Sequence, residues 1–135
     1  MKILRNVLGI IAGLIVGGAA NMLIVIIGGK IIPPPVGVDM TTVDGLKAGM
    51  ALLEPQHFIM PFLAHAMGAL LTALVACLIA ASARFPIALG LGILNLLGGI
   101  AASMMIPAPF WFKAVDLILA YIPMALIGWK LSGKK

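Results

Sequence analysis

The chain has 135 residues, of which 63% are hydrophobic and only 10% are charged, and its net charge is +5. Soluble domains average about half apolar and about a quarter charged residues, so this composition excludes a separate soluble domain. The positive charge does not indicate nucleic-acid binding, because it lies at the ends of apolar segments, where it reports membrane topology.

The first apolar segment covers residues 7–29 and contains no ionisable side chain. At about 1.5 Å per residue, a helix of this length crosses the ~30 Å hydrocarbon core of a bilayer. A basic start at Lys2 and Arg5 also fits a signal peptide, but apolar residues continue through Ile27 without a break. We therefore interpret the segment as a retained transmembrane helix.

Residues 30–57 form a loop that begins with a stiff stretch at Pro33–Pro35. Thr41 or Thr42 is a candidate N-cap for a short helix, with Asp44 in its first turn. An apolar stripe with three- and four-residue spacing follows, formed by Val43, Leu46, Met50 and Leu53. We expect a short amphipathic helix that lies on the membrane surface or folds over the mouth of a helix bundle.

Three further apolar segments follow, at residues 58–83, 87–106 and 114–129. The connection at Arg84–Pro86 is so short that the helices on either side must be antiparallel neighbours. The loop Ile106–Phe112 combines prolines, which end a helix, with aromatic residues that suit the membrane interface. Pro123 should kink the last helix, and Tyr121 should donate to a carbonyl that the kink frees.

These segments predict an all-α fold, a four-transmembrane-helix bundle that forms a single membrane domain over residues 1–135. The positive-inside rule gives its orientation. Six basic residues lie on one side of the predicted membrane, namely Lys2, Arg5, Arg84, Lys130, Lys134 and Lys135. The other side carries three, Lys30, Lys47 and Lys113, so we expect both termini in the cytoplasm.

Small residues recur every four positions on the first three helices and allow close helix packing. The candidate packing glycines are Gly9, Gly13, Gly17, Gly68 and Gly99. Four helices do not easily use all of these faces internally, which favours a homo-oligomer.

Polar residues at membrane depth are the only pointers to function, because each is costly unless it is paired. Counting along the helices places Asn21, His65 and Asn95 at one level, with Glu54, His57 and Asp116 nearer the outer surface. The favoured interpretation is hydrogen bonding between helices. An alternative is a pocket for a small solute, an ion or a lipid head group.

Other chemistry has little support in the sequence. A metal site at Glu54, His57, His65 and Asp116 lacks a recognisable ligand spacing, and Asp116 is expected to neighbour Lys113. No base is expected near Cys77, and no acid–base pair can be placed within reach. We therefore predict no catalytic residues, no bound metal and no cofactor.

The glycine-rich first segment, the Pro-Pro-Pro-Val-Gly-Val-Asp run at 33–39 and the loop Ile106–Phe112 resemble small, uncharacterised bacterial four-span inner-membrane proteins. The resemblance implies a four-helix membrane fold and a bacterial inner-membrane location, but no activity. We expect a structural, lipid-interacting or accessory role in the lipid bilayer, with a further membrane protein as a potential partner. The alternative is a transporter or channel that uses Asn21, His65 and Asn95.

Overall fold

The computed structural model describes residues 1–135 and is all-helical, with 79% of residues in helices and no strand. Its elements are α1 (Lys2–Ile31), α2 (Val43–Gly49), the 3₁₀ helices η1 (Met50–Leu52) and η2 (Pro55–Phe58), α3 (Ile59–Ile79), α4 (Arg84–Met105), α5 (Phe110–Leu119) and α6 (Ile122–Leu131). Four segments are long and apolar enough to cross a membrane: α1, η2 with α3, α4, and α5 with α6. The predicted four-helix membrane fold is confirmed.

The helix ends differ from the expected ones where a turn interrupts an apolar run. The second apolar segment continues to Ala83, but α3 ends at Ile79. Ala83 adopts a left-handed conformation with φ of 53°, and α4 then begins at Arg84 instead of residue 87. Hydropathy cannot locate this turn, because alanines fill it and remain apolar.

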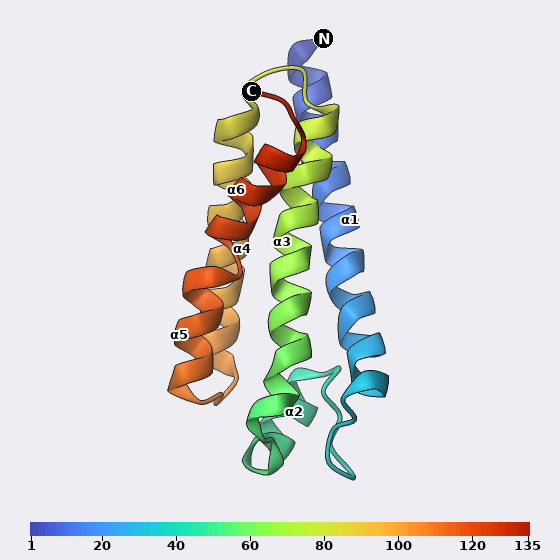
Figure 1. Ribbon diagram of the computed structural model, residues 1–135, viewed down its shortest axis with the longest axis vertical. Coiled ribbons are helices and arrows are strands. Elements are labelled where there is room, and N and C mark those ends of the chain that lie inside the picture. Colours follow the sequence, from blue (N-terminus) through green and yellow to red (C-terminus); the bar gives the residue numbers. More distant parts are fainter.

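Helix α3 is the centre of the molecule. Figure 1 shows α1 running along one side of α3, with α4, α5 and α6 on the other side. The extensive contacts of α1 are all with α3, whereas α3, α4 and α6 pack against one another. The two termini lie at one end of the bundle and α2 lies at the opposite end.

The contact between α1 and α3 is built on glycine. Gly9, Gly13 and Gly17 lie so close to α3 that a methyl group on any of them would collide with its backbone. The facing residues on α3 include Gly68 and Thr72, so two of the expected small-residue faces pair within one chain. This pairing removes part of the sequence argument for a homo-oligomer.

The expected amphipathic helix is present as α2 with η1. The Thr42 hydroxyl accepts the N–H of Gly45 at 3.0 Å and caps α2. Before the cap, the hydroxyl and the backbone N–H of Thr41 both donate to Asp39 and lower the pKa of that carboxyl. These bonds order the residues that lead into α2, a helix that is too short to be stable alone.

The last transmembrane segment is broken, as Pro123 predicts. α5 ends at Leu119, the residue whose carbonyl the Pro123 ring would otherwise meet, and α6 begins at Ile122. Tyr121, at the junction, has φ of −111° and ψ of −79°. The break reorients Tyr121 relative to the residues of α5.

A polar groove as the candidate functional site

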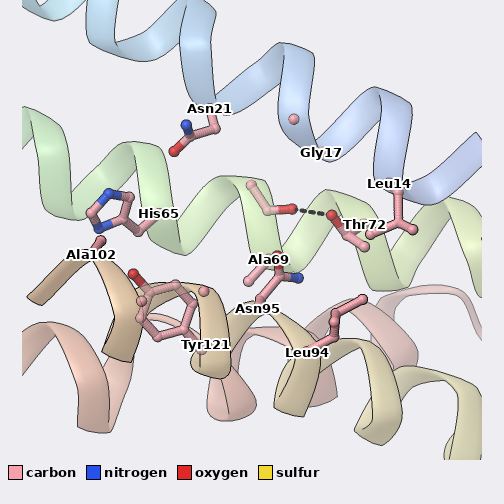
Figure 2. A pocket seen from close by; sticks show the side chains of 14 residues that line it. Leu14, Gly17, Asn21, His65, Ala69, Thr72, Leu94, Asn95, Ala102 and Tyr121 are labelled. Carbon is pink, nitrogen blue, oxygen red and sulfur yellow. Dashed lines mark hydrogen bonds between the residues drawn. The ribbon is translucent and has the colours of Figure 1, made fainter. Parts of the chain in front are cut away.

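A groove of about 280 Å³ lies between α1, α3 and α4, with Tyr121 contributing from the α5–α6 junction. Figure 2 shows its polar side chains, Asn21 on α1, His65 on α3 and Asn95 on α4. Its rim is exposed at Leu14, Gly18, Leu94 and Gly98. The groove therefore opens between α1 and α4, on a surface that faces lipid when the helices cross a membrane.

Behind one wall of the groove, the lining residues His65 and Tyr121 contact Asp116, which does not line the groove itself; we call the three the Asp116 cluster. His65 Nδ1 lies 2.7 Å from Asp116 Oδ1, and the Tyr121 hydroxyl donates to Asp116 Oδ2 at 2.9 Å. The His65 and Tyr121 rings stack with their centroids 5.8 Å apart. Each carboxylate oxygen of Asp116 thus has a partner, as a buried charge requires.

Within the Asp116 cluster, Nδ1 is the His65 ring nitrogen that contacts the carboxylate. When Asp116 is ionised its carboxylate only accepts hydrogen bonds, and in that state His65 Nδ1–H is the donor and Nε2 is the remaining polar atom of the ring. Asp116 is only 5% exposed, whereas the His65 side chain is 31% exposed. His65 therefore has Nε2 as its one unpaired ring nitrogen, and its other nitrogen contacts a buried carboxylate.

Asp116 is buried, and its ion-pair partner is His65 instead of Lys113, although Lys113 lines a small cavity with it. α5 begins at Phe110, four residues earlier than expected, which places Asp116 about 9 Å into the helix. The expected bond from Tyr121 to a freed carbonyl is wrong, because its hydroxyl donates to Asp116.

Asn21, His65 and Asn95 line the same groove, but no hydrogen bond joins them. The Nδ2 atom of Asn95 is buried and has no partner. Leaving such a donor unsatisfied costs roughly 1–3 kcal/mol. The three residues therefore do not form the interhelical network that was the favoured interpretation of the sequence.

Glu54 and His57 lie outside the groove. The Glu54 N–H donates to His57 Nδ1 at 2.8 Å, and the Gln56 amide donates to the Glu54 carboxylate at 2.6 Å. These bonds order the start of η2. No group of three or more His, Cys, Asp or Glu side chains is arranged to hold a metal ion.

A second cavity, of about 130 Å³, lies beneath α2, which we also call the loop helix. Leu46, Met50 and Leu53 line it from the expected apolar stripe, and His65 lines it from α3. His65 and Ala102 border both this cavity and the groove. His65 thus stands between the groove and the end of the bundle that α2 covers.

The groove offers hydrogen-bond donors and one histidine ring, without a free carboxylate. The His65–Asp116 pair is an acid–base pair that sequence reasoning did not place, but a nucleophile beside it is lacking. Cys77 lies three turns further along α3, and the Ser103 hydroxyl donates to its own helix at Ile100. The arrangement suits binding better than covalent catalysis.

Tyr121 is the member of the site that the sequence did not indicate, and Asp116 was a candidate whose pairing with His65 was not predicted. An acidic residue within a transmembrane segment is a weak general signal, because it requires a buried partner. Comparison with known protein families, with curated proteins and with solved structures found no match. The resemblance to bacterial four-span proteins therefore stays a prediction.

Proposed function

We propose that this chain is a membrane protein that binds a small polar solute or a lipid head group in the groove and carries it through the membrane. The observation that carries the proposal is the unpartnered Nδ2 of Asn95 in a groove that His65 also lines. A buried donor without a partner is costly, and a bound ligand would supply the missing acceptor. A role of Asn95 in hydrogen bonding between helices would instead require its amide to be paired.

Two glycines make a sharp test possible. Gly18 and Gly98 line the groove, and a methyl group on either would meet nothing within 4 Å. Gly18→Leu and Gly98→Leu should therefore fill the groove without disturbing helix packing. Gly90→Leu is the matched control, because Gly90 is equally unobstructed on α4 but lies outside the groove.

The measurement is native mass spectrometry of protein released gently from its own membranes. We expect a stoichiometric non-protein mass on the natural chain and on Gly90→Leu, and loss of that mass from both groove variants. Equal retention by Gly98→Leu and Gly90→Leu would contradict binding in the groove. A natural chain carrying only heterogeneous lipid would also contradict the proposal.

That last outcome would favour a structural, lipid-interacting or accessory role, which we propose as the second candidate. An apolar surface cleft of about 480 Å³ supports it, between the start of α3 and α5. Phe58 packs there against Trp111 and Phe112, at ring separations of 5.6 and 4.8 Å. Aromatic residues of this kind favour the membrane interface.

We further propose a bacterial inner-membrane location with both termini in the cytoplasm. The support is the six-to-three distribution of basic residues and the position of both termini at one end of the bundle. A homo-oligomer also stays a proposal. Its support is the exposed side of α1 that faces away from α3, since only four glycines of this helix are buried.

A further inference from the structure

We infer that Arg5 and Arg84 form a binding site for the phosphate of an anionic phospholipid, at the end of the bundle where both termini lie. This site is separate from the groove, so it goes beyond the proposed function. Three features of this end support it: the bonds that hold the two arginines, the N–H groups that they keep free, and the lack of an acidic partner.

The two arginines meet at one helix end. Arg5 on α1 donates from Nε and Nη2 to the carbonyl of Ile79, at 3.2 and 2.9 Å. Arg84, the first residue of α4, donates from Nε to the carbonyls of Cys77 and Ala80, at 3.1 Å each. Because all three carbonyls belong to the end of α3, both guanidinium groups lie against the same turn of the chain. These bonds hold the side chains in place before a ligand arrives, which lowers the entropy cost of binding.

Each guanidinium group keeps donors free. Arg84 uses only Nε, and its Nη1 and Nη2 atoms make no hydrogen bond. Both atoms are accessible, because the buried side-chain atoms without a partner belong only to Asn95 and Trp129. Arg5 is exposed and has Nη1 free. The planar pair of Nη atoms matches two oxygens of one phosphate, and such charge-assisted bonds are the strong kind.

No acidic side chain balances these charges. Asp39, Asp44 and Glu54 lie in the loop that carries α2, at the opposite end of the bundle. The fourth acidic residue, Asp116, forms the one ion pair of the chain, with His65. The carbonyl end of α3 contributes about half a negative charge against the two positive charges of the arginines. The site therefore keeps an excess of positive charge and attracts an anion from outside the chain.

The position of the site favours a phospholipid over a free anion. Arg84 begins a membrane-spanning helix, so it lies at the level of the lipid head groups. The next residue, Phe85, is 42% exposed and packs edge-on against Trp129, with the ring centroids 5.0 Å apart. Aromatic residues of this kind mark the membrane interface, where lipid phosphates are concentrated.

The neighbouring lysines favour an anionic head group. Lys2 lies at the start of α1, Lys130 lies in the last turn of α6, and Lys134 and Lys135 follow that helix. All four are exposed and none forms an ion pair. The choline group of a zwitterionic lipid would add a positive charge among them, whereas phosphatidylglycerol adds none. Basic clusters beside membrane-spanning helices attract anionic lipids for this reason.

The test is native mass spectrometry of the full chain, stripped of its lipids in detergent and titrated with dioleoylphosphatidylglycerol or dioleoylphosphatidylcholine. We expect the first phosphatidylglycerol molecule to bind about tenfold more tightly than phosphatidylcholine, or better. Raising the ammonium acetate concentration about tenfold should weaken the phosphatidylglycerol complex several-fold and leave the other complex unchanged, because salt screens exposed charges. Inorganic phosphate, added as a competitor at the concentration of the lipid, should not displace phosphatidylglycerol.

Arg84→Lys is the decisive variant. It keeps the positive charge and a donor for the α3 carbonyls, but it removes the free pair of Nη atoms. We expect the preference for phosphatidylglycerol to fall by about fivefold or more. Lys130→Arg is the matched control, since it exchanges the same two residue types at the same end and should leave the preference unchanged. Arg5→Lys should lower the preference as well, and it decides the matter if Arg84→Lys does not fold.

Three results would overturn the inference. Equal binding of the two lipids by the natural chain would show that the site does not select an anion. An unchanged preference in Arg84→Lys and Arg5→Lys would show that diffuse positive charge, and not these guanidinium groups, attracts the lipid. Displacement of phosphatidylglycerol by inorganic phosphate would identify a free anion as the ligand. None of these results bears on the groove, because neither arginine lines it.

Discussion

At the scale of single residues, Asp116 is a buried carboxylate with both oxygens paired. Its two oxygens accept one bond each, from a histidine on α3 and from a tyrosine beyond the break in its own segment. In a regular helix, residues five apart point about 140° away from each other, so Tyr121 would not face Asp116. The break before α6 is what brings the two together.

Replacing Tyr121 with Phe should therefore destabilise the protein. It removes the hydroxyl that donates to Asp116 Oδ2, and a hydrogen bond to a charged group is worth about 1.5–3 kcal/mol. The measurement is the free energy of unfolding in mixed micelles. Ser103→Ala is the control, with an expected change below about 0.5 kcal/mol, because its hydroxyl donates only within α4. Equal effects of the two substitutions would contradict the role of Tyr121.

Part of the site was predictable at this scale. Counting helical rise along three apolar segments placed Asn21, His65 and Asn95 at one level, and the structure brings them to one groove. Their lack of mutual hydrogen bonds was not predictable, because depth along a helix does not give the direction of a side chain. The pairing of Asp116 with His65 was not predicted, because α5 starts in a segment, Phe110–Lys113, that reads as an interfacial loop.

At the scale of elements, basic side chains bond to the backbone at the end of α3. Arg5 donates to the carbonyl of Ile79 at 2.9 Å, and Arg84 donates to Cys77 and Ala80 at 3.1 Å each. Asn6 accepts the next two N–H groups, from Ala81 and Ser82. Together they pair three carbonyls and two N–H groups at the end of α3.

The glycine contact of α1 gives a prediction for element packing. A methyl group at Gly13 would collide with the Thr72 carbonyl, so Gly13→Ala should lower the free energy of unfolding by about 1–3 kcal/mol. Gly90→Ala is the matched control, since nothing lies within 4 Å of that position, and it should be neutral or slightly stabilising. Steric trapping in bicelles measures both. A neutral Gly13→Ala would show that α1 can move away from α3 at little cost.

The loop helix gives a second prediction at this scale. Leu46 lines the cavity beneath α2, so Leu46→Asp should release the helix from the bundle and speed proteolysis after Lys47. Leu52→Asp serves as the control, because Leu52 is 59% exposed and does not line that cavity. Limited trypsin digestion in detergent compares the two rates. If both variants are cut at the rate of the natural chain, the docked position of α2 is not maintained in solution.

At the scale of the whole molecule, both termini lie at one end and the loop helix at the other. Single cysteines in a Cys77→Ala background test the proposed orientation with a membrane-impermeant maleimide. Lys47→Cys should be labelled on intact cells, whereas Lys135→Cys should be labelled only after the membrane is opened. Labelling of both on intact cells would indicate that the chain inserts in two orientations.

The dependence of α1 on α3 also has a consequence for synthesis. The run Gly9, Gly13 and Gly17 of α1 is complete at Gly17, but the last residue that it contacts, Ala80 directly after α3, is made 63 residues later. At about 5–20 residues per second, that interval lasts roughly 3–13 s. During this time α1 is in the bilayer with its closest-packing surface bare. A neighbouring nascent chain or an insertion factor with a small-residue face therefore competes with α3 for α1 before the protein is finished.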